Sequence, residues 1–408
     1  MKGETIIQTK VEENEQTNVY LPLFANGGIA WLFGVTGPLL LVMQSAEMGN
    51  LSSEITTSWI FSIYVVGGFL TVILSIYYRQ PIAAAFSIPG AVLVGTSLMN
   101  HSFSDVVGAY LVTGIFILIL GLSGVIHKVM ERLPTPIMMG MVSGVLLPFG
   151  IDIFLSISSE PIINGIAFIV FLVISYFSTL AKRLPPILAS MIVAGILVWL
   201  VEPFPLHDVS VHISQPQFFL PTFNLQAIGE LVIPLALTVI AIQNSQGIGV
   251  LKSLDYTPPI NGMTNWSGIG SIINGFFGAH SACIAGPMTA IIADDSSGAK
   301  ENRYKSGVIM GVMWIIFGLF ASVAVAVINM IPISIIQLLA GLALLSVLKK
   351  SLEMSFANRY KMGALFAFMI TMSGVTFLNI GAPFWGIVGG VLISLIFEKN
   401  DFKQRALS

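Results

Sequence analysis

Residues 85–98 read AFSIPGAVLVGTSL, which places Ser87, Pro89 and Gly90 in the middle of a stretch apolar enough to lie in a membrane. Proline and glycine both disfavour the interior of a helix. Proline is tolerated in the first turn, because its missing N–H would be unpaired there. The stretch therefore predicts an extended segment over 82–88 and a short helix that begins near Pro89.

Composition places the chain in a lipid bilayer. Of its 408 residues, 55% are hydrophobic and 9% are charged, whereas soluble domains carry about 25% charged residues. The net charge of -2 gives no sign of a nucleic-acid partner. The single cysteine, Cys283, excludes an intrachain disulfide and a cysteine metal cluster. We expect no metal, no cofactor and no catalytic residues.

Hydropathy predicts eleven clear membrane spans and three weaker ones. Each clear span approaches the roughly 20 residues that a helix needs to cross a bilayer. The weaker stretches are 81–99, 264–278 and 283–295. The clear spans lie near 22–44, 55–77, 105–126, 136–154, 161–180, 185–201, 226–250, 304–329, 332–348, 360–379 and 382–397.

The distribution of basic residues indicates that all three weak stretches cross. With 14 crossings, all 18 lysines and arginines fall on one side of the membrane, and cytoplasmic loops are enriched in these residues. Both termini are then cytoplasmic. The predicted parts are a tail over 1–19, a first repeat over 20–201, an outer linker over 202–225, a second repeat over 226–398 and a tail over 399–408.

Two repeats of seven spans enter the membrane from opposite sides, which is typical of inverted-repeat transporters. The third span then corresponds to the tenth, whose sequence HSACIAGPMTAIIADD (280–295) is also interrupted by glycine and proline. Both half-helices would point their N-termini at the midplane, where unpaired N–H groups favour an anion. Ordinary kinks in packed helices are the alternative. The predicted binding residues at the breaks are Ser87, Ile88, Pro89, Gly90, Ala285, Gly286 and Pro287.

Polar residues near the breaks extend this prediction. Gln243 and Asn244 in the eighth span either orient a substrate carboxylate or join helices by hydrogen bonds. His280 either carries a coupled proton or has a structural role. Glu230, at the outer start of the eighth span, either acts in a gate or is solvated. No acidic residue falls in the middle of a span, so the sequence does not identify the coupling residue.

Four stretches resemble the BenE family of benzoate/proton symporters: AFSIPGAVLVGTSL (85–98), QNSQGIGVLKSLDYTPPI (243–260), QLLAGLALLSVLKKSL (337–352) and SGVTFLNIGAPFWGIVGG (373–390). The resemblance implies a UraA-like fold of seven plus seven spans, with spans 1–4 and 8–11 in a core and spans 5–7 and 12–14 in a gate. It also implies proton-coupled uptake of an aromatic carboxylate, often by a homodimer.

Together these observations predict an all-α polytopic protein of the plasma or inner membrane, in contact with lipid. Its expected activity is the import of a small organic anion, benzoate or a related carboxylate, together with a proton. An uncoupled or exchange-type transporter of inorganic anions or other small carboxylates is the alternative on the same fold. A membrane-embedded enzyme would need catalytic His, Asp or Glu side chains at a common depth, and the sequence places none there.

Overall fold

A computed structural model describes residues 20–124, 134–177, 184–201, 211–357, 359–375, 377 and 382–406. The predicted tail over 1–19 and the basic residues at 128, 132, 182 and 183 lie outside the described residues. The first half begins with a helix over Tyr20–Met48, which is interrupted at Thr36 and continues as α2 (Gly37–Met48). The elements that follow are α3 (Ser53–Tyr78), β1 (Ala84–Phe86), α4 (Ile88–Leu98), α5 (Phe103–Ser123), α7 (Thr135–Ser159), α8 (Pro161–Tyr176) and α10 (Pro186–Val201).

The second half begins with α11, which passes through a π-helical turn over Thr238–Asn244 into α12. Two 3₁₀ turns, Asp295–Ser297 and Lys300–Asn302, lie between α14 and α15. The elements in order are α11 (Leu225–Leu237), α12 (Ser245–Ser253), α13 (Ile260–Phe276), β2 (Ala282–Ile284), α14 (Gly286–Ala293), α15 (Tyr304–Leu319), α16 (Ala321–Asn329), α17 (Ile333–Phe356), α18 (Lys361–Met372), α19 (Ala382–Phe397) and α20 (Lys399–Ala406).

Six helices in the described part of the chain are long and apolar enough to cross a membrane. A seventh crossing is formed if Lys300–Leu319 and Ala321–Asn329, which meet at an angle of 65°, are taken as one bent span. The other predicted crossings coincide with shorter helices, such as the 16-residue α8 and the 8-residue α14. The chain is thus a polytopic helical membrane protein, and length alone does not establish 14 crossings.

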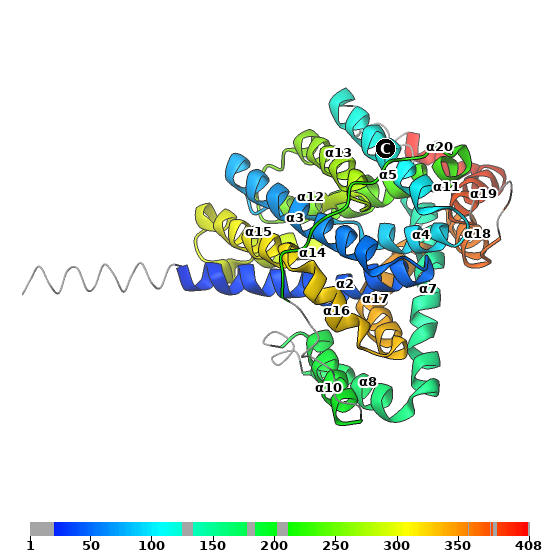
Figure 1. The fold of residues 1–408 in the computed structure, drawn as a ribbon. Helices are drawn as coiled ribbons and strands as arrows, with labels where there is room; N and C mark the ends of the chain where they lie inside the picture. Colours follow the sequence, from blue (N-terminus) through cyan, green and yellow to red (C-terminus); the bar gives the residue numbers. More distant parts are fainter. Residues whose placement is uncertain are drawn as a thin grey trace, which may run out of the picture.

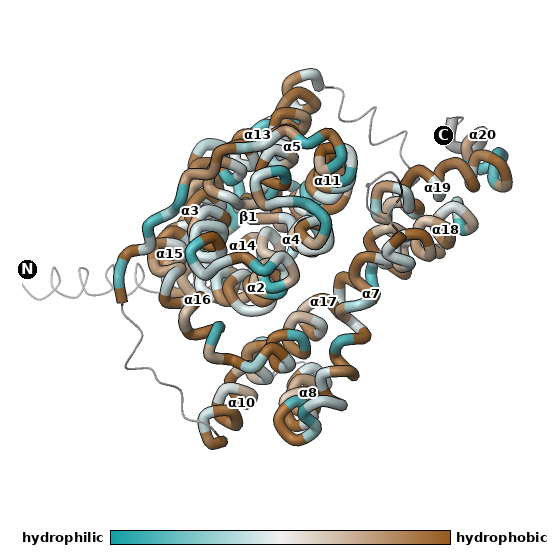
Figure 2. Tube along the Cα trace, turned by 45° about the vertical axis from the view of Figure 1, so that its right-hand side comes forward, coloured by the Kyte–Doolittle hydropathy of each residue, from teal (hydrophilic) through white to brown (hydrophobic). Residues whose placement is uncertain are grey.

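The helices pack into two groups (Figure 1). In the first group, α3 packs along α15, α5 packs along α13 and α11, and α2 packs along α4. In the second group, α7 packs along α17 and α18, α8 along α10, and α18 along α19. The groups touch where α2 meets α17, α4 meets α7, and α11 meets α19. Figure 2 shows the second group to one side of the helices that surround β1.

Residues 211–224 form an extended strap over the first group (Figure 1). The Ser214 backbone N–H donates to the Leu319 carbonyl over 2.7 Å, and the Phe219 N–H donates to the Phe276 carbonyl over 2.8 Å. At its far end the Thr222 hydroxyl donates to the Asp105 carboxylate over 2.6 Å. The strap therefore fastens the ends of several helices of the first group to one another.

The C-terminal segment, predicted as a tail over 399–408, contains helix α20. The Tyr360 backbone N–H donates to the Asp401 carboxylate over 2.8 Å, and the rings of Tyr360 and Phe402 lie 4.8 Å apart, edge to face. These contacts hold the first turn of α20 against the start of α18.

Candidate functional site

Two short strands cross in the interior of the first helix group. β1 and β2 pair antiparallel, with Ala85 opposite Cys283, and all six strand residues are buried. The pairing extends by one bond at each end, from Ser87 N–H to the Ser281 carbonyl (3.1 Å) and from Ala285 N–H to the Ala83 carbonyl (2.9 Å). Backbone N–H and C=O groups that are buried away from water must be hydrogen-bonded, and each strand supplies these partners for the other.

The strand pair sets the directions of the two helices that follow it. Because β1 and β2 are antiparallel, α4 and α14 leave the pair in opposite directions, and their N-terminal N–H groups face each other along it. Ser87 and Ala285 are four residues apart in the register, which corresponds to roughly 13 Å of strand. The two helix N-termini therefore lie at opposite ends of the strand pair rather than in direct contact.

The N-terminus of α4 is closed by its own chain. The Ser87 hydroxyl accepts a hydrogen bond from Gly90 N–H (3.1 Å) and donates one to the Thr238 hydroxyl (2.9 Å). Ser87 is completely buried. A serine cap of this kind satisfies one of the unpaired donors of the first turn, which leaves this end less available to a ligand.

The N-terminus of α14 is open by comparison. Its N-cap residue, Ala285, has no side chain that caps the helix. Pro287 in the first turn is exposed, although Gly286 and Met288 on either side of it are buried. The half-buried Gln246 of α12 covers Gly286 so closely that a Cβ atom there would lie 2.6 Å from the Gln246 Cβ. An uncapped helix N-terminus beside an accessible surface is a favourable place for an anion.

A cation lies at the opposite end of α14. The Arg303 guanidinium donates to the Ala293 carbonyl over 2.9 Å, and its Nη2 lies 2.7 Å from the Asp295 carboxylate. Positive charge at a helix C-terminus complements the helix dipole. Arg303 therefore holds the C-terminal end of α14. At the N-terminal end, the positive charge comes from the backbone N–H groups.

The two predicted amides have different surroundings. The Asn244 side-chain oxygen accepts the Ile284 backbone N–H over 2.7 Å, and its Nδ2 donates to the Ser267 hydroxyl over 3.2 Å. Asn244 thus holds β2 in place. Gln243 is only 7% exposed as a residue, and no hydrogen bond joins its side chain to another described residue. Its amide atoms are not among the fully enclosed unpaired polar atoms of the described chain, so water or a ligand can reach this amide and hydrogen-bond to it.

Both amides lie at the end of a π-helical turn, in which Asn244 is hydrogen-bonded to β2 and Gln243 is not. An inserted residue of this type alters the direction of side chains within a helix and is frequent at functional sites. The Ser245 hydroxyl donates to the Ile240 carbonyl, five residues earlier, over 3.0 Å. Thr238, at the start of the turn, receives the hydrogen bond from Ser87. The turn therefore joins the α4 cap to the segment that carries Gln243.

His280 is buried between the two strands and α3. Trp59 Nε1–H donates to His280 Nδ1 over 2.9 Å, and His280 Nε2–H donates to the Ser87 carbonyl over 2.9 Å. The tautomer follows from this network, because an indole N–H can only donate. A proton on Nδ1 would oppose the Trp59 N–H, so the contacts favour the structural role over the proton-carrying role. The imidazole also meets the Phe86 ring edge to face at 5.6 Å.

Sequence reasoning missed several partners of these residues. Thr238 and Trp59 lie in apolar spans, where nothing in the sequence marks them. Tyr64 and Trp314 pack edge to face at 5.2 Å beside Phe86. Only the register of the strands and the packing of α3 against α15 bring these side chains together.

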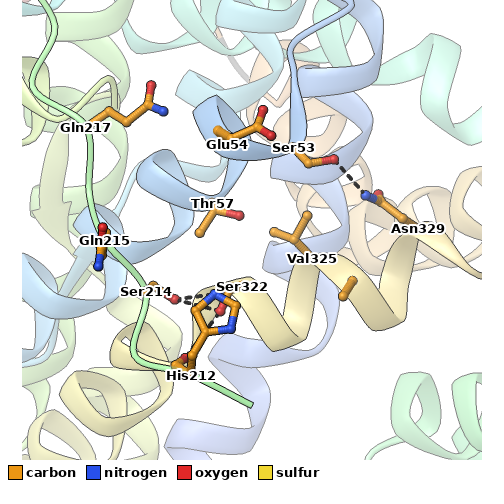
Figure 3. A pocket seen from close by; sticks show the side chains of 11 residues that line it. Ser53, Glu54, Thr57, His212, Ser214, Gln215, Gln217, Ser322, Val325 and Asn329 are labelled. Atoms are coloured by element: carbon orange, nitrogen blue, oxygen red, sulfur yellow. Dashed lines mark hydrogen bonds between the residues drawn. The ribbon is translucent and has the colours of Figure 1, made fainter. Parts of the chain in front are cut away.

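A separate cavity of about 690 Å³ lies beneath the strap, at the start of α3 (Figure 3). Its lining includes Glu54, His212 and Asn329 and contains none of the predicted binding residues. Asn329 donates to the Ser53 hydroxyl over 3.2 Å across one edge. Among the described residues that line it, Glu54 supplies a carboxylate and none is a lysine or arginine, so their charge does not favour an organic anion.

Comparison with known proteins places the chain in a family. Residues 18–396 match the family described as "Benzoate membrane transport protein", BenE. The chain belongs to the BenE family. It is 29% identical over 390 residues to the inner membrane protein YdcO of Escherichia coli, covering 93% of this chain and 98% of the relative. It is 28% identical over 375 residues to the benzoate membrane transport protein of Acinetobacter baylyi, covering 91% and 94%.

Solved structures share the fold of this BenE member. The transmembrane domain of the cyanobacterial bicarbonate transporter BicA matches with a TM-score of 0.59 at 16% identity, covering 93% of this chain and 97% of that one. SLC26A9 matches with a TM-score of 0.61 at 16% identity, covering 92% and 64%. The chain is therefore a multi-pass membrane protein of a transporter family, with the fold of BicA and SLC26A9.

Proposed function

We propose that this protein is a proton-coupled symporter that imports a small aromatic carboxylate, benzoate or a near relative. Membership of the BenE family and the name of the Acinetobacter relative support the substrate class. The observation that carries the proposal is Gln243, a residue only 7% exposed whose amide has no hydrogen-bond partner among the described residues, on the segment beside the uncapped N-terminus of α14.

In this proposal the carboxylate lies between α14 and the π-helical turn. One carboxylate oxygen accepts hydrogen bonds from the N–H groups of Gly286 and Met288, and the other accepts one from the Gln243 amide. The positive end of α14 supplies the counter-charge, so no lysine or arginine side chain is needed. Ile88 and Pro287, the apolar residues with accessible surface at the two helix starts, border the aromatic ring.

The proposal includes the inverted-repeat topology. Residues 20–201 and 226–398 form two repeats with 14 crossings, and β1–α4 and β2–α14 are the third and the tenth. Both termini face the cytoplasm of a cell whose plasma or inner membrane holds the protein. The first helix group moves against the second along the α2–α17, α4–α7 and α11–α19 contacts, and two copies form a dimer.

Uptake into proteoliposomes tests this function. Radiolabelled benzoate should accumulate when an inward proton gradient is imposed, and unlabelled aromatic carboxylates should compete while uracil should not. Folded, reconstituted protein that takes up no benzoate would overturn the substrate assignment.

Uncoupled transport of inorganic anions is the alternative that the fold raises. The BicA structure is described as that of a bicarbonate transporter, and a helix N-terminus binds small inorganic anions as readily as carboxylates. Anion uptake that is inhibited by bicarbonate and does not depend on the proton gradient would favour this alternative over the symporter.

A further inference from the structure

α13 carries three buried polar side chains on the face that meets β2. Ser267, Ser271 and Asn274 recur at helical spacing, which places them on one face of the helix. Each is at most 2% exposed, and α13 packs against β2. We call these three residues the α13 row. They are part of the reason why 264–278 is a weak hydrophobic stretch in the sequence.

Two members of the row bind the backbone at and before β2. The Ser271 hydroxyl accepts the Ala282 backbone N–H over 3.0 Å and donates to the Ser267 carbonyl over 2.7 Å. The Asn274 amide donates to the His280 carbonyl over 3.0 Å. Backbone groups of successive strand residues point to alternate edges, so the Ala282 N–H lies on the edge of β2 that faces away from β1. Without Ser271 this buried N–H would lose its partner.

The third member of the row acts through Asn244. The Ser267 hydroxyl accepts a hydrogen bond from Asn244 Nδ2 over 3.2 Å and donates to the Met263 carbonyl over 2.9 Å. With Nδ2 directed at Ser267, the Asn244 oxygen faces the Ile284 N–H, which it accepts over 2.7 Å. Asn244 follows Gln243 directly in the chain. Ser267 therefore anchors the segment that carries Gln243 as well as the end of β2.

The α13 row thus holds both parts of the carboxylate site. α14 begins at Gly286, directly after its N-cap Ala285 and the end of β2 at Ile284, so the position of β2 sets where the free N–H groups of α14 lie. The Asn244 contact sets the position of Gln243. Binding groups must be held within roughly 0.5 Å of their productive positions by supporting contacts of this kind.

The first half of the chain has a matching contact at the other strand. The Thr71 hydroxyl of α3 accepts the Ala84 N–H over 2.9 Å, at the first residue of β1, as Ser271 does at the first residue of β2. β1 leads into α4, whose N-terminus is capped by Ser87. The Thr71 contact therefore supports a closed helix end, whereas the Ser271 contact supports an open one.

We propose that Ser271 and Ser267 are positioning residues of the carboxylate site. Ser271 holds the start of β2 and, through β2, the N-terminus of α14. Ser267 holds the Asn244 amide and, through it, Gln243. Neither hydroxyl contacts the substrate. The assignment rests on the proposed function, because only a ligand bound between α14 and Gln243 depends on both contacts.

The experiment compares wild type with Ser271→Ala, Ser267→Ala and Thr71→Val. Each substitution removes one hydroxyl, and Thr71→Val is the matched control because it removes the equivalent strand contact at the closed helix end. Equilibrium binding of radiolabelled benzoate and backbone hydrogen exchange by mass spectrometry are measured on the purified proteins. Initial rates of benzoate uptake are measured in proteoliposomes, and size-exclusion profiles check that each variant folds.

Ser271→Ala and Ser267→Ala should each raise the dissociation constant and the KM for benzoate by about five- to tenfold. The maximal rate should stay within about twofold, because a binding group is displaced and not removed. Thr71→Val should bind benzoate within about twofold of wild type. Hydrogen exchange should quicken over 281–289 in the two serine variants and over 83–91 in the control, since each loses a contact at that strand.

An unchanged dissociation constant in either folded serine variant would overturn the assignment for that residue. Equal weakening of binding in Thr71→Val would also overturn it, because any loosening of the strand pair would then act alike. A wild type that binds no benzoate would instead refute the proposed function. The exchange data would still decide the structural claim, since unchanged exchange over 281–289 in Ser271→Ala would show that this hydroxyl does not hold β2.

Discussion

His280 Nε2 donates a hydrogen bond to the carbonyl of Ser87 over 2.9 Å, from a side chain that is completely buried. Ser87 is the residue at which β1 ends and α4 begins, and its hydroxyl reaches both Gly90 and Thr238. One imidazole therefore fixes the point at which the chain changes from strand to helix in its first half. The site depends on this point because it sets where the N-terminus of α4 lies.

His280→Gln should slow transport and leave coupling intact. A glutamine amide can donate to the Ser87 carbonyl but does not fill the imidazole site, so we expect the maximal rate to fall by about tenfold, as for a displaced positioning group. The number of protons taken up per benzoate should not change. The measurement is simultaneous radiolabel uptake and proton influx. A changed ratio would mean that His280 carries the proton.

Asn244→Ala and Gln243→Ala should separate stability from binding. Loss of the Asn244 amide leaves the buried Ile284 N–H without its 2.7 Å partner, which costs about 1–3 kcal/mol. Gln243 has no partner to lose among the described residues, so Gln243→Ala should unfold at the wild-type temperature or slightly above it. Thermal unfolding of the purified proteins measures both. Equal destabilisation by the two substitutions would contradict these roles.

Gly286→Ala should abolish most transport, because its methyl group would lie 2.6 Å from the Gln246 Cβ and force α12 away from α14. Gly249→Ala is the matched control on α12, since nothing lies within 4 Å of a Cβ at Gly249. The control should keep its activity and gain up to about 1 kcal/mol from the better helix former. Uptake rates at equal protein density provide the comparison, and similar rates in both variants would show that the α12–α14 contact does not shape the site.

Tyr256 should make stability depend on pH in the alkaline range. Burial raises the pKa of its phenol above the ordinary value, and its hydroxyl donates to the Lys300 carbonyl over 3.0 Å. The folded protein thus holds this proton more tightly than the unfolded chain. The stabilisation is complete below about pH 10, the pKa of a free tyrosine, and declines as the pH rises beyond that value.

Tyr256→Phe tests this dependence. The phenyl ring remains beneath the Lys300 ammonium, whose Nζ lies 4.8 Å from the ring centre, but the ionisable group is gone. Unfolding temperatures measured from about pH 8 to about pH 10.5 should therefore decline less steeply in the variant than in wild type. Parallel curves would assign the alkaline loss to other groups.

The sequence predicts the strand–helix character of residues 82–98 and 280–293 because proline and glycine act locally. Proline is favoured in the first turn of a helix, so its position marks where an extended segment gives way to a helix. Pro89 and Pro287 both occupy that turn. The pairing of the strands is not local. Only the packing of the two halves of the chain brings Ala85 opposite Cys283. The same packing sets the distance between the two helix starts, which is roughly 13 Å.

For the polar residues, too, the sequence predicts some features and the packing alone determines others. That Gln243 and Asn244 need partners follows from their position in an apolar span, but which amide is satisfied depends on the π-helical turn and on the position of Ile284. The burial of Glu230 also could not be predicted, because its partner His101 lies 129 residues away in the sequence. Contacts of this range depend on how α4 and α11 pack, which local pattern does not encode.

Equilibrium binding of radiolabelled benzoate to purified wild type and Gln243→Ala tests the central claim most directly. The account predicts saturable binding to wild type, displaced by aromatic carboxylates, and a dissociation constant about tenfold higher in Gln243→Ala, equivalent to the loss of about 1.4 kcal/mol. An unchanged dissociation constant in the folded variant would contradict a carboxylate site between Gln243 and the N-terminus of α14.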